Sequence, residues 1–337
     1  MIRSKLLRIA SATTAAVVLT TPSHAAFRAY IASTGADNPS CSLASPCRLL
    51  PAAITAVDAG GEIWMLDSAN YNSGQVNITK SVSILAVPGA VGSVLATGGT
   101  NAISIATPSI KVSLRNLVIV MSGSAANGIS YTDGTELIIS ECEVANISGM
   151  GAAVYAWALG GKLTIKDSTL RNSNYNLYVA FVTATLDRVR ILNSSNIGLY
   201  AYNGSRLTIN DSLISGNNTG AFIYSGGSGV GYAAINRSVI SGNAQGLYVQ
   251  SVVTGDITDV VLSNSTVTLN TGNGITVYQG ASSVSKLTLD GNNVTLNGAG
   301  LAVSAGTPAI LTRSNNTFTY NSSGNDISGI VTGLAAQ

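Results

Sequence analysis

The chain has 337 residues, of which 9% are charged, with 17 Lys and Arg against 15 Asp and Glu. This near balance gives no electrostatic basis for binding nucleic acid or an anionic membrane surface. It contains only three cysteines, which is too few for a fold held together mainly by disulfides.

The first 25 residues have the three parts of a secretory signal. Arg3, Lys5 and Arg8 form a basic start, residues 9–19 are apolar, and Ser23-His24-Ala25 is a small-x-small cleavage site. The apolar run is too short to cross a bilayer, and no later run is apolar over ~18 residues. We therefore expect a mature chain without a membrane span that is secreted, periplasmic or at the cell surface. A retained membrane anchor is the alternative.

Residues 26–71 interrupt the pattern of the rest of the chain and are expected to form an N-terminal cap. They begin with a short strand at residues 29–32 and a turn-rich loop that contains Cys41 and Cys47. In the oxidising compartment that export implies, we interpret this pair as a disulfide. A metal site is the alternative, although the mature chain has no histidine. The remaining Cys142 is expected to be buried as a small apolar residue.

Residues 48–59 form the one segment with a helical pattern. Pro51 lies in its first turn, its apolar residues share one side, and Gly60 with Gly61 is expected to end it. An open stack of strands needs its end covered, and this helix is suited to that role. Short strands are then predicted at residues 62–66, 76–78, 82–85 and 103–105.

From about residue 100 onward the chain repeats a unit of roughly 21–27 residues, found by subtracting the positions of equivalent apolar residues. Each copy, such as residues 197–218, alternates apolar and polar residues with a period of two, which favours strands over helices. One apolar column consists of Ile119, Val144, Leu170, Ile191, Ile214, Ile240, Val267, Val294 and Phe318. A second contains Leu262 and Leu289 and is predicted to end at Arg313. A turn column contains Asn217, Asn243, Asn270, Asn297 and Asn321, whose amides can bond from layer to layer.

These columns predict an all-β fold: a single-stranded parallel β-helix of ten or more coils with an N-terminal capping helix. The β-helix is assigned to residues 72–330, and the chain is expected to become irregular from about Asn321, with a tail at residues 331–337. A solenoid with a neutral polar exterior also accounts for the low content of charged residues.

The start of the mature chain resembles a known family. The segments Tyr30–Pro39, Pro46-Cys47-Arg48 and Gly60–Asp67, followed by Tyr71, look like the opening of secreted bacterial right-handed β-helix proteins of the pectin-lyase-like superfamily. The resemblance extends over the later repeats. It implies the fold but leaves the activity open, because that fold hosts lyases, hydrolases, epimerases, adhesins and phage fibres.

Alternation predicts a ladder of aromatic residues on the outer surface of successive coils, about 4.8 Å apart. The candidate substrate-binding residues are Tyr155, Trp157, Tyr178, Tyr200, Tyr202, Phe222, Tyr224 and Tyr248. Flat aromatic faces with hydroxyl rims suit the apolar faces of sugar rings. The alternatives are that the rings stack on one another for stability, or that they contact a protein partner.

A second outward column carries charges. Glu141, Glu143 and Asp167 could supply oxygen ligands to a calcium ion. By resemblance to pectate lyases, Arg188 or Arg190 would then abstract the proton beside a uronate carboxylate, and Lys166 is a further catalytic candidate. The alternative is a ladder of ion pairs between coils, with Asp167, Arg188, Asp211 and Arg237 alternating in sign.

The signature motifs of the enzymes of this superfamily are absent from the sequence. Polygalacturonases carry Asn-Thr-Asp, Asp-Asp, Gly-His-Gly and Arg-Ile-Lys, and pectate lyases carry Trp-Ile-Asp-His. We therefore expect an exported protein that binds polysaccharide without catalysis. A lyase acting on acidic glycans, with calcium, is the first alternative, and an adhesive or structural surface protein is the second.

Overall fold

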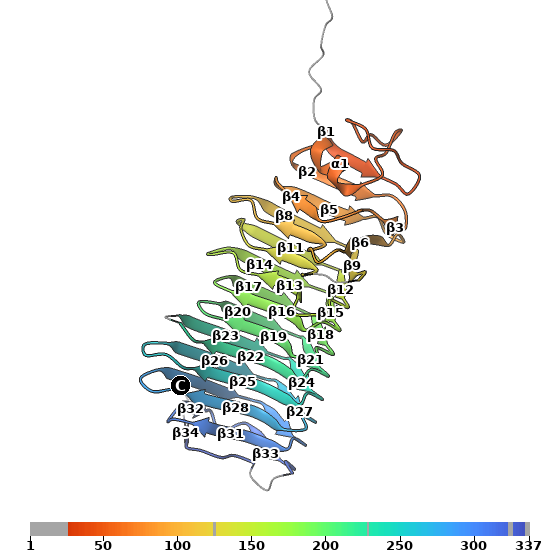
Figure 1. Ribbon diagram of the computed structural model, residues 1–337. Coiled ribbons are helices and arrows are strands. Elements are labelled where there is room, and N and C mark those ends of the chain that lie inside the picture. The colour runs from red at the N-terminus through yellow and green to blue at the C-terminus, as the bar shows by residue number, and fades with distance from the viewer. Residues whose placement is uncertain (1–25, 124–125, 228, 323–325, 334–337) are drawn as a thin grey trace, which may run out of the picture.

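The computed structural model describes residues 26–123, 126–227, 229–322 and 326–333, so the expected signal at residues 1–25 lies outside the described residues. The chain winds into an elongated right-handed parallel β-helix of about ten turns (Figure 1). Each full coil contributes one strand to each of three parallel sheets. The predicted fold class is therefore confirmed.

The three sheets run the length of the molecule, and in each of them the strands follow one another from the N-terminal end in chain order. The 13-stranded sheet consists of β1 (Ala26–Ile31), β2 (Val57–Met65), β5 (Val82–Ala86), β8 (Lys111–Arg115), β11 (Glu136–Ser140), β14 (Lys162–Lys166), β17 (Thr183–Asp187), β20 (Arg206–Asn210), β23 (Val230–Asn236), β26 (Ile257–Ser263), β29 (Val284–Asp290), β32 (Ala309–Thr312) and β34 (Val331–Gly333). The 10-stranded sheet consists of β4 (Val76–Ile78), β7 (Ile103–Ile105), β10 (Ile129–Tyr131), β13 (Ala152–Ala156), β16 (Tyr175–Ala180), β19 (Ile197–Tyr202), β22 (Thr219–Ser225), β25 (Gln245–Ser251), β28 (Asn273–Gln279) and β31 (Ala299–Ala305). The 11-stranded sheet consists of β3 (Ala69–Asn70), β6 (Gly92–Ala96), β9 (Leu117–Met121), β12 (Glu143–Ala145), β15 (Thr169–Arg171), β18 (Arg190–Leu192), β21 (Leu213–Ser215), β24 (Val239–Ser241), β27 (Thr266–Thr268), β30 (Asn293–Thr295) and β33 (Thr317–Thr319).

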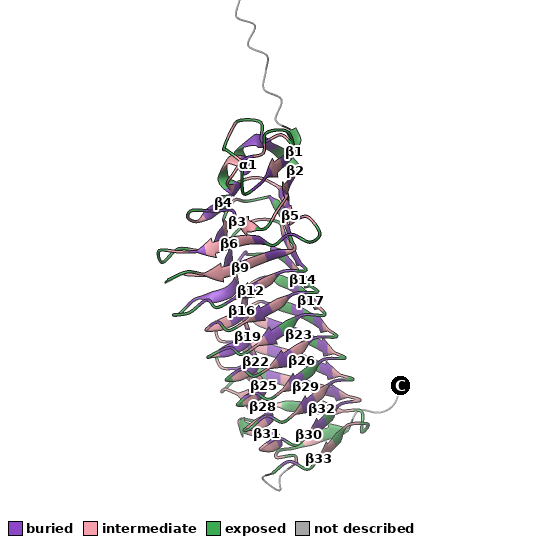
Figure 2. Cartoon of the chain, turned by 90° about the vertical axis from the view of Figure 1, so that its right-hand side faces the viewer, coloured by how far each residue is buried: buried purple, intermediate pink, exposed green. Residues whose placement is uncertain are grey.

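The core lies inside the coils and is built from the predicted apolar columns (Figure 2). Ile214, for example, pairs with Ile191 on one side and Ile240 on the other, and all three are fully buried. Period-two alternation turns every second residue of a strand inward, and stacking places equivalent residues of neighbouring coils against one another. The register of the central coils is therefore the one that the repeat predicts.

The prediction for Arg313 is wrong by one residue. Leu289 pairs with Thr312, and the buried residue that pairs with Leu287 is Ile310. Arg313 instead lies outside, where its Nε is 3.4 Å from Asp290 Oδ2. The stack also continues past Asn321, because β34 pairs with β32.

A column of buried asparagines joins the coils at one turn. Asn243 Oδ1 accepts hydrogen bonds from the main-chain N–H and the Nδ2 of Asn217, both at 2.9 Å, and Asn243 Nδ2 donates to Asn270 Oδ1 at 2.9 Å. The same pattern repeats through Asn297 to Asn321. At the end of the column, Asn321 Nδ2 donates to Asp326 Oδ1 at 2.7 Å. The side-chain amides thus satisfy buried main-chain groups that the turns leave unpaired.

The helix α1 (Leu50–Ala56) packs against β1, β2 and β4 at the N-terminal end, as expected for a cap (Figure 1). It is shorter than predicted, because Val57 is already extended and opens β2. Gly60, with φ +86°, therefore lies within the strand and does not end the helix. This helix is not long enough to span a membrane, and no other described segment is such a helix.

The cysteines have the predicted roles. Cys41 and Cys47 form a disulfide that closes the loop of the cap. Cys142 is a buried free thiol in an inward column, where its main-chain N–H donates to Ser168 Oγ at 3.1 Å. Burial raises the pKa of the Cys142 thiol to about 12, which makes a nucleophilic role unfavourable.

Candidate functional site

The outward face of the 10-stranded sheet carries the predicted aromatic column. Tyr155 pairs with Tyr178, Tyr178 with Tyr200, Tyr200 with Phe222, and Phe222 with Tyr248. In the strands β13, β16, β19, β22 and β25, these residues occupy equivalent positions between inward-facing, buried residues. Parallel stacking in register therefore brings side chains that are 22 to 26 residues apart in sequence into direct contact.

A second column lies beside the first. Tyr202 pairs with Tyr224, and the position of Tyr202 in the preceding coil is held by the small, buried Ala180. Trp157, just after β13, lies over this gap, with its ring centroid 6.0 Å from those of both Tyr178 and Tyr202.

Sequence reasoning missed two members of the cluster. Tyr175, at the start of β16, stacks with Tyr200 at 5.9 Å, and Phe181 lies 5.5 Å from Trp157. Tyr175 precedes the regular alternation of its repeat, and Phe181 has a left-handed backbone with φ +58°. We refer to the ten residues together as the aromatic surface: Tyr155, Trp157, Tyr175, Tyr178, Phe181, Tyr200, Tyr202, Phe222, Tyr224 and Tyr248.

The rings of the aromatic surface shield one another but stay accessible to solvent. Neighbouring ring centroids lie 4.7 to 6.3 Å apart, in stacked, tilted and edge-on arrangements. Most of the rings are half-buried, and Trp157 is 36% exposed. Such offset and edge-on pairs are favourable beyond the area they bury. The surface is thus a packed layer with an outer side that can still contact a ligand.

Five hydroxyl groups of this layer have a raised pKa. Burial raises the pKa of Tyr155, Tyr178, Tyr200, Tyr224 and Tyr248 above the ordinary value of 10.0. At neutral pH these side chains are therefore uncharged and can both donate and accept hydrogen bonds.

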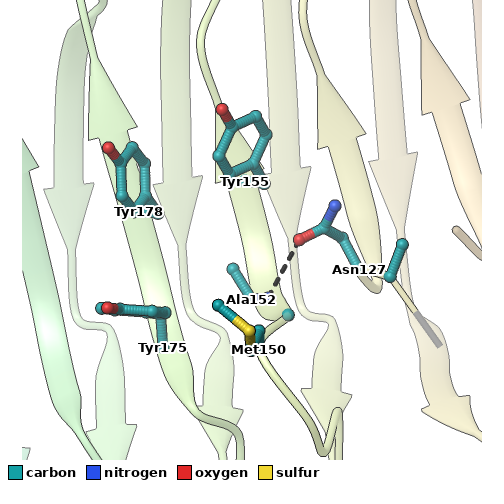
Figure 3. A pocket seen from close by; sticks show the side chains of 8 residues that line it. Asn127, Met150, Ala152, Tyr155, Tyr175 and Tyr178 are labelled. Atoms are coloured by element: carbon teal, nitrogen blue, oxygen red, sulfur yellow. Dashed lines mark hydrogen bonds between the residues drawn. The ribbon is translucent and has the colours of Figure 1, made fainter. Parts of the chain in front are cut away.

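A pocket of about 380 Å³ lies at the N-terminal end of the aromatic surface (Figure 3). Tyr155, Tyr175 and Tyr178 form one side, and Met150 lies near its rim. On the other side, Asn127 Oδ1 accepts a hydrogen bond from the main-chain N–H of Ala152 at 2.9 Å. Asn127 Nδ2 donates to Asn101 Oδ1 at 2.9 Å, so the amide is held in a fixed orientation.

The predicted calcium ligands each lie next to an arginine. Glu141 is 3.0 Å from Arg115, and Glu143 Oε1 accepts a hydrogen bond from Arg171 Nε at 2.7 Å. Asp167 accepts two hydrogen bonds from the Arg188 guanidinium, at 2.7 and 3.0 Å. In the described part of the chain, no three residues of the types His, Cys, Asp and Glu are grouped closely enough to hold a metal ion.

The charged column forms ion pairs between neighbouring coils. Arg188 contacts Asp167 of the preceding coil, and also Asp187, its neighbour in the chain. Arg237 donates two hydrogen bonds to Asp211, at 2.7 and 2.8 Å. The neighbouring guanidinium groups hold the pKa of Asp167 and Asp211 below the ordinary value of 3.8. This is the arrangement that the ion-pair interpretation predicts.

The other catalytic candidates are also on the surface. Lys166 ends β14 and Arg190 begins β18, and both side chains are exposed. They lie on the 13-stranded and 11-stranded sheets, away from the sheet that carries the aromatic surface. Their proposed catalytic role stays a prediction.

Solved structures of several proteins are similar to this chain in fold. Full-length tailspike protein 2 of an Escherichia coli O157:H7 bacteriophage matches with a TM-score of 0.56 and 11% identity, over 78% of this chain and 39% of its own. The chain thus spans less than half of that tailspike. Pectate lyase Pel9A matches with a TM-score of 0.54 and 12% identity, over 92% of this chain and 78% of its own. At such identities the likeness shows the fold alone.

A comparison with curated proteins finds no match. In contrast, the family described as right handed beta helix region matches residues 101–249 and 153–322, which together span about two thirds of the chain. These matches cover the coils that carry the aromatic surface and the ion pairs. The chain therefore belongs to the right-handed β-helix family.

Proposed function

We propose that this protein binds polysaccharide along the aromatic surface and does not cleave it. The observation that carries the proposal is a continuous layer of ten rings on five consecutive coils. With about 4.8 Å between coils, four steps give the main column a length of about 19 Å. A strip of this kind offers several stacking positions in a row, as an extended chain of sugar rings requires.

The accessible side of the layer has the chemistry that sugars need. Ring faces contact the C–H groups of a sugar ring, and uncharged tyrosine hydroxyls exchange hydrogen bonds with its hydroxyl groups. An exposed apolar strip of this extent on a soluble domain favours a binding role. The fold shared with a pectate lyase supports polysaccharide as the ligand class.

The surroundings of the aromatic surface argue against catalysis there. Glycoside hydrolysis requires an acid and a base carboxylate on either side of the scissile bond. The ten strands of this sheet contain no Asp or Glu. The alternative lyase site has less support, because Arg188 is engaged by Asp167 and Asp187 and is not free to act as a base.

Trp157→Ala tests the proposal, because this ring is exposed and contacts four others. Affinity for polysaccharides should fall at least tenfold, as is typical of a tryptophan that contributes strongly to an interface. Tyr232→Ala is the matched control: this ring lies on the 13-stranded sheet, 4.5 Å from Arg206, and its loss should leave the affinity within about twofold.

Three results would contradict the proposal. The first is equal loss of affinity in both variants, and the second is no binding of any polysaccharide by the wild type. The third is a steady rise of ultraviolet absorbance on incubation with acidic polysaccharides and calcium, since a lyase releases unsaturated products that absorb and binding alone releases none.

A further inference from the structure

The sheet that carries the aromatic surface is free of charge along its whole length. None of its ten strands, all of them described, contains Asp, Glu, Lys or Arg. The neighbouring 13-stranded sheet is different, because it carries residues such as Arg206, Asp259 and Lys286. A pocket of about 300 Å³ on that sheet is accordingly lined by Arg206 and Asp259. The absence of charge is therefore a local property of the aromatic face.

A charge-free surface discriminates between glycans. A uronate or sialic acid carboxylate that settles on the rings loses part of its hydration and finds no cation in exchange, which is costly. An uncharged sugar has no such penalty. The tyrosine hydroxyls that are available to it are themselves neutral at physiological pH.

The pocket at the N-terminal end of the aromatic surface discriminates between glycans by a second property, the substituent that enters it. Among the described residues, its lining consists of the rings of Tyr155, Tyr175 and Tyr178 together with Met150 and alanine side chains, without a charged group. The one amide, Asn127, is already bonded to Ala152 and Asn101. Met150 is 92% exposed at its rim. A methyl group placed among these side chains gains contact with the ring faces and the thioether, whereas a hydroxyl group at the same position replaces its bonds to water only where a tyrosine hydroxyl is within reach.

We infer that the aromatic surface takes an uncharged glycan and that this pocket receives a substituent ending in a methyl group, either an acetamido group or the methyl of a 6-deoxy sugar. The inference rests on the proposed function and specifies its ligand class. A pocket of this kind typically discriminates one methyl or methylene group by about tenfold or more.

Direct binding to an immobilised glycan panel tests this inference. Chitotetraose and cellotetraose share one backbone and differ in the acetamido group, while rhamnose-containing and mannose-containing oligosaccharides test the 6-deoxy methyl. Polygalacturonate and sialylated glycans form the charged arm. We expect chitotetraose to bind about tenfold more tightly than cellotetraose, or the rhamnose-containing oligosaccharides about tenfold more tightly than the mannose-containing ones. The charged glycans should bind least.

The outcomes distinguish a failure of the inferred ligand class from a failure of polysaccharide binding itself. Equal affinity with and without the methyl group, or a preference for the charged arm, overturns this inference and leaves polysaccharide binding intact. No binding in any arm overturns the proposed function as well.

Met150→Glu provides the matching test on the protein. A carboxylate at the rim should lower affinity for the preferred glycan at least fivefold, because it brings an unpaired charge and removes the thioether contact. Leu43→Glu is the control, an exposed apolar residue in the disulfide loop of the cap that should change affinity by less than about twofold. Unchanged affinity in Met150→Glu, with the melting temperature of the wild type, would overturn the assignment of the pocket.

Discussion

Tyr200 is the most connected ring of the aromatic surface, so its removal measures what the ring packing contributes. Its centroid lies 5.0 Å from Tyr178, 5.4 Å from Phe222, and 5.9 to 6.3 Å from Tyr175, Tyr202 and Tyr224. At the lower end of the usual range, about 0.5 kcal/mol per aromatic pair, five pairs amount to about 2.5 kcal/mol. Tyr200→Ala should therefore destabilise the protein by about 3 kcal/mol once some lost burial is included.

Two further variants make this a matched series. Tyr248 has a single ring partner among the described residues, Phe222 at 4.7 Å, so Tyr248→Ala should cost only about 1–2 kcal/mol. Tyr200→Phe keeps the ring and should change stability by less than about 0.5 kcal/mol. Urea unfolding followed by circular dichroism gives the three free energies, and glycan affinity is measured on the same samples.

A binding role and a purely structural role of the rings predict different combinations of stability and glycan affinity. If the rings bind sugar, Tyr200→Ala lowers both stability and affinity, and Tyr200→Phe lowers affinity alone wherever the hydroxyl contacts the ligand. Affinity that is unchanged in Tyr200→Ala, together with a large fall in melting temperature, would show a purely structural stack and refute the binding role. A destabilisation no larger than that of Tyr248→Ala would refute the reasoning from ring packing.

Three other predictions concern the coils around the site. Asn243→Ala should lower the free energy of unfolding, measured in urea, by about 3–5 kcal/mol, because it leaves the main-chain N–H of Asn217 and other buried groups unpaired. A loss below ~1 kcal/mol would contradict a stabilising role of the asparagine column. The buried Cys142 thiol, with its raised pKa, should resist alkylation at pH 8 until the protein unfolds, and rapid labelling of the native protein would show that it is accessible. Arg188→Gln should raise the pKa of Asp167 towards 3.8, as measured by carboxyl NMR titration. Because the pKa of Asp167 is lower in the folded than in the unfolded protein, its contribution to stability is present above the unfolded pKa and is lost as the pH falls through the folded pKa. An unchanged pKa of Asp167 in Arg188→Gln would show that Arg188 does not cause the shift.

The fold and the main aromatic column could be predicted because both follow from the same repeat. Alternation fixes which side of a strand faces inward, and stacking in register then decides which residues meet, as Tyr178, Tyr200 and Phe222 do. Neither step needs knowledge of distant parts of the chain. The buried asparagine column follows from the same reasoning, since identical residues recur at one turn.

What could not be predicted depends on contacts outside the repeat. Val57 belongs to a strand and not to the helix because it pairs with Ala26, a tertiary contact that overrides local preference. Phe181 enters the aromatic surface through a left-handed turn, a conformation usually taken by glycine or asparagine. The repeat places Arg313 one residue out of register because, counted between paired residues, the turn from β32 to β33 has one more residue than the turn from β29 to β30.

The pocket at the end of the aromatic surface could not be predicted from the sequence either. It depends on the side chains of three coils, with Asn127 on one and Tyr175 on another, and on the loop that carries Met150. Residues of such different types do not form a repeating column. A signal was nevertheless present in the charge pattern, because the strands of this sheet can be recognised from the repeat and contain no charged residue.

The most direct test of sugar binding at the aromatic surface is the fluorescence of Trp157. The chain has two tryptophans, and Trp64→Phe removes the one in the cap, which lies under Arg28. Titration of this variant with the preferred glycan should change the Trp157 emission in a saturable way, with the dissociation constant found by direct binding. A glycan that binds to the variant without any change in Trp157 emission would place the binding site elsewhere and contradict the account.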